Sequence, residues 1–257
     1  NHYVFKQPDR LMDNIERVTK HIRGKLLAEG CTDIARRVLN IVYTKAGRCL
    51  TQDSQGNYWR VFDLIDNART YDVVTSQDVI HQAAAAFGRF QRYLADLPAP
   101  PLYDTIPYFH DGLKRFSAFT EAVQKDACNR AAQAADEIEF MNRRVVIFER
   151  LAGLISRGRI PIRVTHNDTK INNVMIDDTT GRGICVIDLD TTMPGVSLYD
   201  FGDLVRTTVT DCAEDEQDLS KFSIETDRFK AVLHGFLEGA GPMLNDEEKS
   251  NLLLGGL

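Results

Sequence analysis

The 257-residue sequence lacks the signals of several specialised classes of protein. Its apolar runs stay well short of the roughly 20 residues that a membrane helix needs. Its five cysteines include no CxxC pair and no zinc-type Cys/His spacing, which argues against a disulfide framework and predicts free thiols in a reducing compartment. We therefore expect a cytoplasmic protein that does not enter the membrane.

Positive charge is not in excess either. Lys and Arg number 31 against 37 Asp and Glu, so the formal net charge is −6 at pH 7. An acidic balance argues against broad binding to nucleic acid, whose phosphates attract basic surfaces. We expect small-molecule partners and no nucleic acid, and no feature of the sequence predicts an oligomeric state.

A glycine-rich phosphate loop is also missing. Neither GxGxxG nor GxxxxGK[ST] occurs, and Gly181-Arg182-Gly183 lies in a predicted turn rather than before a helix. These residues therefore contain neither a dinucleotide-binding fingerprint nor a P-loop.

Apolar residues make up 43% of the chain, which suffices for a sizeable core. Helical spacing covers residues 9–29, and short β-like runs follow at 38–43, near Cys49 and at 58–64. Beyond Asp66 the pattern turns mostly helical, which predicts an α+β fold with a smaller lobe over residues 1–65 and a larger one over 66–257. The helices expected after this boundary cover residues 75–94, 131–157, 198–208, 223–238 and 246–254.

The most informative segment runs from residue 163 to 190. We expect a strand at 163–165, a loop at 166–173, and two strands at 174–176 and 184–189 joined by a turn. This hairpin would bring Asn173 close to Asp188, and amide and carboxylate oxygens are hard donors that suit Mg²⁺. The pattern predicts a magnesium site at these two residues, with Asp190 as a candidate ligand of a second metal, directly or through water.

Asp168 lies on the same loop, five residues before Asn173. Phosphoryl transfer from ATP needs metal-bound phosphates, an aligned hydroxyl, and a carboxylate that orients the hydroxyl and takes its proton. Asp168 is predicted to be that carboxylate, and Lys170 to meet the charge of the transferring phosphate. Taken singly, such residues are common turn formers. Their combined types, spacing and strand-turn-strand context favour the catalytic interpretation.

The pattern HxDxxxxN followed by IDxD resembles the aminoglycoside phosphotransferase and choline kinase superfamily. Within it, the strings HNDTKINNVMID, CVIDLDTTMPG and SLYDFGDLVR are most similar to the bacterial N-acetylhexosamine 1-kinase branch. The resemblance implies a two-lobe, protein-kinase-like fold with ATP as co-substrate and Mg²⁺ as cofactor. It implies that Asp168 is the catalytic base, that Asn173 and Asp188 bind magnesium, and that His166 positions the loop.

The same resemblance places a nucleotide-binding hinge at residues 58–65. The backbone of Asp63, Leu64 and Ile65 would meet the adenine, and Phe62 would line the pocket together with Leu64. The alternative for this segment is an ordinary amphipathic strand. Glu16 matches the position that pairs with a phosphate-binding lysine, although an exposed glutamate on a helix is common.

In this family the phosphate loop and its lysine-bearing strand precede the first helix, and the last helices help to hold the sugar. The chain begins with Asn1 and ends within the apolar residues 252–257. We expect these parts to lie upstream and downstream, so that the small lobe is incomplete and the C-terminal end truncated. The 257 residues alone are then expected to have little activity.

Two acidic residues of the predicted helix at 198–208 allow more than one interpretation. By the resemblance, Asp200 braces the catalytic loop by accepting backbone hydrogen bonds, but Ser197-x-x-Asp200 also has the form of a helix capping box. Asp203 and Arg206 lie three residues apart on one helix face and are interpreted as a local ion pair.

The resemblance implies a kinase that phosphorylates the anomeric hydroxyl of N-acetylglucosamine or N-acetylgalactosamine to the 1-phosphate. An aminoglycoside, choline or another sugar could serve as acceptor on the same machinery, because fold and motif do not choose among them. A non-catalytic nucleotide-binding module and a metal-dependent phosphohydrolase are the alternatives from other classes.

Overall fold

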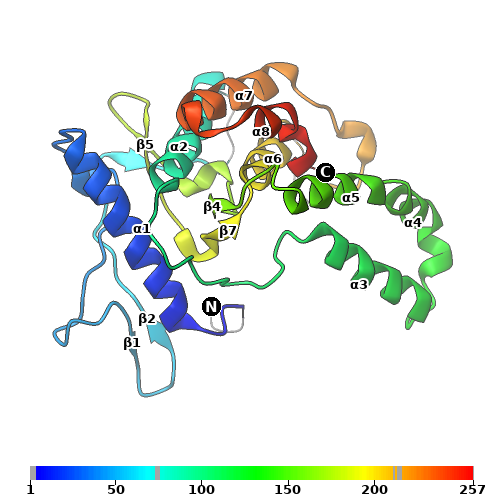
Figure 1. Ribbon diagram of the computed structural model, residues 1–257, viewed down its shortest axis with the longest axis horizontal. Helices are drawn as coiled ribbons and strands as arrows, with labels where there is room; N and C mark the ends of the chain where they lie inside the picture. The colour runs from blue at the N-terminus through cyan, green and yellow to red at the C-terminus, as the bar shows by residue number, and fades with distance from the viewer. Residues whose placement is uncertain (1–3, 73–75, 211, 213–215, 257) are drawn as a thin grey trace.

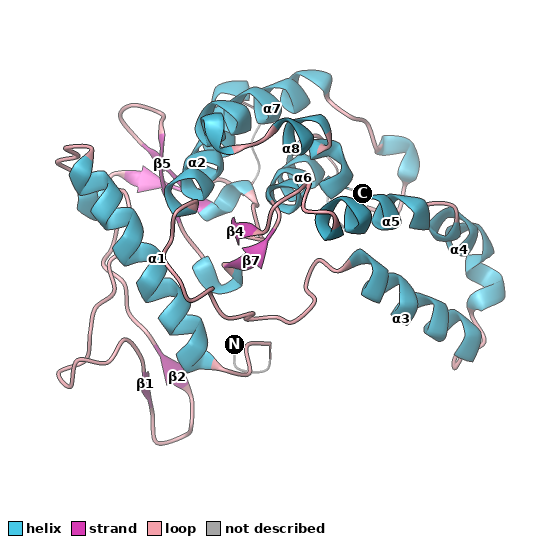
Figure 2. Ribbon diagram, viewed as in Figure 1, coloured by secondary structure: helices cyan, strands magenta, loops and turns pink. Residues whose placement is uncertain are grey.

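The computed structural model describes residues 4–72, 76–210, 212 and 216–256. Helices dominate and the strands are few and short (Figure 2), which confirms the predicted α+β class. The helices are α1 (Pro8–Ala28), α2 (Gln77–Leu94), α3 (Gly112–Lys125), α4 (Ala135–Asn142), α5 (Val145–Ser156), α6 (Ser197–Thr208), α7 (Thr226–Ala240) and α8 (Asp246–Ser250). The strands are β1 (Thr51–Gln52), β2 (Tyr58–Trp59), β3 (Ala68–Arg69), β4 (Arg163–Thr165), β5 (Val174–Asp177), β6 (Gly183–Val186) and β7 (Met193–Gly195).

Three regions are visible in Figure 1. The long helix α1 and the hairpin of β1 and β2 lie on one side. Helices α2, α6 and α7 lie at the centre beside the short strands. Helices α3, α4 and α5 extend to the other side as an arm. In the part of the chain that the structure describes, no helix is both long and apolar enough to cross a membrane.

The first helix forms where the apolar spacing predicts it, with Pro8 at its start, where the missing N–H is not needed. Asn14, in its middle, is fully buried. Its amide donates to the carbonyl oxygens of Tyr103 (2.8 Å) and Thr192 (3.1 Å) and accepts from the Tyr103 N–H (2.9 Å). These bonds fix α1 to two loops of the larger part of the molecule.

The strands before residue 66 are shorter than predicted. β1 and β2 form a two-residue antiparallel pair, and the expected strand at residues 38–43 is reduced to one isolated bridge between Ile41 and Phe62. Two hydrogen bonds flank the bridge, from Val42 N–H to Val61 O (2.9 Å) and from Asp63 N–H to Asn40 O (3.0 Å). The strand predicted at residues 38–43 was therefore wrong, because apolar runs in a sequence do not show how long two strands stay paired.

The hairpin of the catalytic segment is confirmed. β5 and β6 pair antiparallel, with Val174 opposite Val186, and the turn between them is held by the Asp177 carboxylate. β3 adds a third strand to this sheet by pairing with β5, which the sequence did not reveal. β4 pairs separately with β7, with Arg163 opposite Gly195.

One predicted helix is wrong. Residues 131–157 do not form a single helix, because a short 3₁₀ turn precedes α4 and a turn at Arg143 and Arg144 separates α4 from α5. None of the α4 residues is buried, so no core contact forces the two helices into one line. Helix α3 was not predicted at all. Together α3, α4 and α5 make the arm seen in Figure 1.

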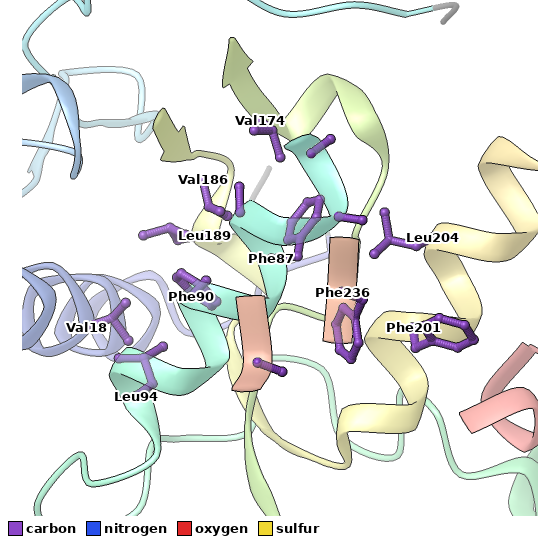
Figure 3. Packing of buried hydrophobic residues seen from close by; sticks show 14 of the residues in the cluster. Val18, Phe87, Phe90, Leu94, Val174, Val186, Leu189, Phe201, Leu204 and Phe236 are labelled. Carbon is purple, nitrogen blue, oxygen red and sulfur yellow. The ribbon is translucent and has the colours of Figure 1, made fainter. Parts of the chain in front are cut away.

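The core is built around a close crossing of α2 and α7. A Cβ atom on Gly239 would overlap the carbonyl oxygen of Ala85, and one on Gly88 would lie 2.5 Å from that of Phe236. Figure 3 shows the aromatic and aliphatic side chains that pack around this crossing. The same buried cluster includes Val18 of α1, so it extends across residue 66. The division into lobes at 1–65 and 66–257 stays a prediction.

Candidate active site

The HxDxxxxN segment forms a loop between β4 and β5, as predicted. Asn167 is buried and has a φ of 66°, a left-handed conformation that asparagine adopts more readily than most residues. Asp168 follows it and is partly exposed. The central carboxylate therefore reaches solvent from a loop in which the neighbouring residues Asn167 and Thr169 are buried.

His166 has the structural role that was predicted for it. It is fully buried, and its ring lies edge-on to Phe87 and Phe90. Its Nδ1 lies 3.3 Å from the N–H of Asp168 and its Nε2 lies 2.9 Å from the carbonyl oxygen of Ile187. Because a backbone N–H can only donate, Nδ1 is the acceptor and Nε2 carries the proton. The ring thereby joins the catalytic loop to the strand that leads to Asp188.

Asp200, on α6, braces the loop from the other side. It is fully buried and accepts hydrogen bonds from the N–H groups of His166 (2.9 Å) and Asn167 (2.7 Å) and from the Gln91 amide (2.6 Å). Burial raises the pKa of Asp200, while His166 and these donors oppose the rise. The helix begins after Val196 without a side-chain cap, so the bracing interpretation is correct and the capping box is wrong.

The two predicted metal ligands are brought together by the hairpin. The Ile187 N–H donates to the carbonyl oxygen of Asn173 (2.9 Å), so Asp188 lies beside Asn173. The Asn173 amide nitrogen donates to the carbonyl oxygen of Asp168 (2.9 Å) and lies 3.4 Å from Oδ2 of the Asp168 carboxylate. Because the nitrogen is used in this way, the amide oxygen of Asn173 is the atom that can ligate a cation.

Asp188 is exposed and has a φ of 55°, a conformation that non-glycine residues adopt at strained functional positions. Loss of hydration, and then the charge of Asp190, raise the pKa of Asp188. A divalent cation would offset both effects. In residues 4–72, 76–210, 212 and 216–256, no group of three His, Cys, Asp or Glu side chains could hold a metal alone. One carboxylate and one amide oxygen fit Mg²⁺, which keeps waters and phosphate oxygens in its coordination sphere.

Asp190 and Lys170 lie near this centre. Asp190 is mostly buried, and its Oδ1 lies 2.6 Å from Nη1 of Arg60, which joins the loop after β6 to the predicted hinge segment. Lys170 lies two residues after Asp168 and is partly buried. The roles of Asp190 at a second metal and of Lys170 at the transferring phosphate stay predictions.

The predicted hinge residues 62–65 lie shortly before β3, the strand that pairs with β5 of the hairpin. The N–H of Asp63 donates to the carbonyl oxygen of Asn40, and Phe62 is partly buried against the core. Leu64 is 85% exposed, whereas Ile65 is buried with Ile184 in a small apolar cluster. The segment thus has one exposed apolar side chain, Leu64, followed by a buried one, Ile65. Adenine binding by these residues stays a prediction.

Glu16 lies on α1, where the Tyr43 hydroxyl donates to its Oε1 (2.8 Å). Its expected lysine partner belongs to a segment that was predicted to lie upstream of Asn1. The pairing of Glu16 with a phosphate-binding lysine therefore stays a prediction.

A large open pocket lies between the arm and the catalytic loop. Its volume is about 930 Å³, and most of its lining is apolar and aromatic, including Phe116 and Phe148 of the arm. His110 reaches the loop itself, with Nε2 at 3.2 Å from the carbonyl oxygen of Asn167, and its ring lies beside Tyr199. No motif singled out this pocket, because its walls come from segments far apart in the sequence.

The comparisons with known proteins agree with this geometry. A model of the phosphotransferase enzyme family matches residues 6–231 of the chain. The chain belongs to this family. The match spans α1, the predicted hinge segment, the HxDxxxxN loop and the hairpin of β5 and β6.

Solved structures share the fold at low sequence identity. An amicoumacin kinase in complex with AMP-PNP, Ca²⁺ and Ami aligns over 93% of this chain with 16% identity and a TM-score of 0.57. A spectinomycin phosphotransferase in complex with ADP and spectinomycin covers 92%, with 14% identity and a TM-score of 0.54. An aminoglycoside phosphotransferase from Alicyclobacillus acidocaldarius covers 96%, with 14% identity and a TM-score of 0.58. The chain spans 65%, 67% and 69% of the length of these structures.

Proposed function

We propose that the complete protein transfers the γ-phosphoryl group of ATP to the anomeric hydroxyl of an N-acetylhexosamine, giving the 1-phosphate. The observation that carries the proposal is the convergence of Asp168, Asn173 and Asp188 on one loop and hairpin. Family membership supports the reaction class, and the similarity of the HNDTKINN and IDLDTTMPG strings to N-acetylhexosamine 1-kinases supports the acceptor.

In this reaction the acceptor oxygen bonds to the γ-phosphorus while the bond to the bridging oxygen of ADP breaks. Asp168 orients the hydroxyl and receives its proton as that bond forms. The N–H of Asp168 donates to His166, its carbonyl oxygen accepts from Asn173, and the N–H of the preceding Asn167 donates to Asp200. These bonds keep the backbone of Asp168 in place before the substrate arrives, so little reorganisation is needed during transfer.

Asn173 and Asp188 would hold Mg²⁺ through one amide and one carboxylate oxygen. When bound, the cation neutralises charge on the phosphates. The protein supplies the fixed positions: Asn173 is oriented by Asp168, and Asp188 directly follows Ile187, whose carbonyl oxygen is bonded to His166.

The pocket beside the arm is the proposed acceptor site. It reaches the catalytic loop at Asn167, and its volume of about 930 Å³ suits a small molecule. Aromatic side chains can pack against the C–H face of a sugar ring, and His110 and Asp104 supply polar groups at the end nearest the loop. On the nucleotide side, Leu64 and the cluster around Ile65 would contact the adenine.

Phosphorus NMR of the complete protein with Mg-ATP and a panel of acceptors tests the proposal. The panel holds N-acetylglucosamine, N-acetylgalactosamine, choline and aminoglycosides. We expect a sugar 1-phosphate from the N-acetylhexosamines. Asp168→Asn should lower kcat by roughly 10²- to 10⁴-fold, because the amide cannot take the proton.

Each other outcome changes the proposal in a defined way. Turnover of an aminoglycoside or choline alone would retain the mechanism and overturn the acceptor. Release of phosphate without any acceptor would favour a phosphohydrolase. Binding of Mg-ATP without any turnover would indicate a non-catalytic module.

A further inference from the structure

Asp203 has a partner that its local sequence does not reveal. Its Oδ2 accepts a hydrogen bond from the N–H of Thr169 (2.7 Å), the residue directly after Asp168. Its Oδ1 accepts from Arg206 (2.8 Å), so the expected ion pair is present as well. The two carboxylate oxygens of Asp203 therefore have different partners: Oδ1 bonds within the helix, and Oδ2 bonds to the catalytic loop.

Asp200 and Asp203 lie one turn apart on α6 and act on opposite sides of Asp168. Asp200 accepts from the N–H groups of His166 (2.9 Å) and Asn167 (2.7 Å), before the base. Asp203 accepts from the N–H group of Thr169, after it. The Thr169 hydroxyl donates to the carbonyl oxygen of Asp200 (2.6 Å), and Thr169 is fully buried. The loop is thus attached to α6 on both sides of the catalytic carboxylate.

We propose that Asp203 is a positioning residue for the catalytic base, acting through the backbone of Thr169. This inference rests on the proposed phosphoryl transfer. The backbone of Asp168 can shift only if the peptide groups on both sides of it move. The carboxylate of Asp200 restrains only the preceding peptides, and the carbonyl oxygen of the following peptide is held by Asn173. Asp203 restrains the N–H group of this following peptide. Its carboxylate makes a charge-assisted hydrogen bond, which is stronger than a hydrogen bond between neutral groups.

The ion pair with Arg206 is secondary in this arrangement. Arg206 is about half exposed and Asp203 is 12% exposed, and a solvent-exposed partner adds little stability. Removing Arg206 should therefore leave the Thr169 bond in place, which makes it the matched control.

Three variants of the complete protein separate these roles. Asp203→Ala removes both contacts, Asp203→Asn retains an oxygen that can accept from Thr169, and Arg206→Gln removes the ion pair while leaving the Asp203 carboxylate in place. Amide hydrogen exchange followed by NMR reads the backbone directly and needs no acceptor. In Asp203→Ala we expect the Thr169 amide to exchange at least about tenfold faster, while the amides of His166 and Asn167, bound to Asp200, stay protected.

Steady-state kinetics give the second measurement. In Asp203→Ala, kcat should fall roughly 10- to 100-fold with the KM for ATP changed by less than about threefold, because one charge-assisted hydrogen bond to the base's loop is lost. Asp203→Asn should recover most of the loss, and Arg206→Gln should stay within about twofold of the parent protein.

Two results would overturn the inference: unchanged exchange at Thr169 in Asp203→Ala, or an equal loss of kcat in Arg206→Gln. A raised KM with unchanged kcat would also contradict it. If Asp203→Ala does not fold, amide exchange in Asp203→Asn decides instead. Loss of the charge weakens the hydrogen bond, so exchange of the Thr169 amide should still rise while the amides bound to Asp200 stay protected. If the parent protein transfers phosphate to no acceptor, the proposed function fails, whereas the exchange result still reports whether Asp203 holds the loop.

Discussion

At the scale of single residues, the catalytic loop rests on a tightly packed polar layer. The Thr165 hydroxyl lies 3.0 Å from Oδ1 of Asn167 and 3.3 Å from the carbonyl oxygen of Met193. The Asn167 amide donates to the carbonyl oxygen of Thr191 (2.9 Å). Gly195, on β7, lies directly against this layer, so that a Cβ there would overlap the Thr165 hydroxyl and lie 3.1 Å from the Asn167 amide oxygen.

Gly195→Ala should therefore damage the site without touching any reacting group. We expect kcat to fall and the free energy of unfolding to drop by roughly 1–3 kcal/mol, because the new methyl group overpacks the layer. Urea unfolding and steady-state kinetics measure the two effects. Thr165→Ala in the same chain removes the overlapping hydroxyl and should restore part of the loss. Strictly additive effects in the double variant would contradict this explanation.

The local pattern singles out the candidate catalytic and metal-binding residues, but it does not reveal all of the residues that hold them in place. Asp168, Asn173 and Asp188 follow from a short motif and one hairpin. The contact from Asp203 to Thr169 joins residues 34 positions apart, and the contact from Gln91 to Asp200 joins residues 109 apart. Such partners depend on how α2 and α6 pack, which no periodicity encodes.

At the scale of elements, the crossing of α2 and α7 supports the site from behind. Small residues on both helices let the backbones touch at Gly239 and Gly88. α2 carries Phe87 and Phe90, which pack against His166, and Gln91, which donates to Asp200. The distance between α2 and α7 therefore affects the catalytic loop through α2.

Gly239→Ala should separate the two helices, because the added Cβ would overlap the Ala85 carbonyl oxygen. We expect a loss of roughly 1–3 kcal/mol in the free energy of unfolding, measured by urea denaturation. Gly24→Ala on α1 is the matched control, since an added Cβ there meets no atom within 4 Å in the described part of the chain. That variant should be neutral or gain up to about 1 kcal/mol from higher helix propensity. Equal losses in the two variants would contradict the packing argument.

At the scale of the whole molecule, Arg36 connects the segment after the hinge to the catalytic hairpin. Its guanidinium donates to the carbonyl oxygens of Asp66 (3.1 Å) and Asn67 (2.9 Å) and pairs with Asp177 (2.7 Å). The Asp177 carboxylate also accepts from the Thr180 hydroxyl. The Thr180 bond first, and then Arg36, hold the pKa of Asp177 well below its usual range.

The lowered pKa predicts how stability changes with acid. Because the folded pKa of Asp177 lies below the unfolded value of about 3.9, its contribution is complete above that value and is lost as the pH falls through the folded pKa. Asp177→Asn should therefore be less stable than the parent at neutral pH, and the gap should narrow on acidification below about pH 4. Urea midpoints measured from pH 7 downward test this, and a gap independent of pH would contradict it.

The sequence by itself determined the family, the α+β class, the first helix and the catalytic hairpin, because these depend on short-range spacing and on residue types that suit few reactions. It did not determine the break between α4 and α5, the lengths of the strands before residue 66, or the pocket beside the arm. Only the tertiary structure decided that Asp200 braces the loop instead of capping a helix, and that Asp203 reaches Thr169. The physical reason is that a hydrogen bond between distant residues forms only where packed helices bring donor and acceptor within about 3 Å.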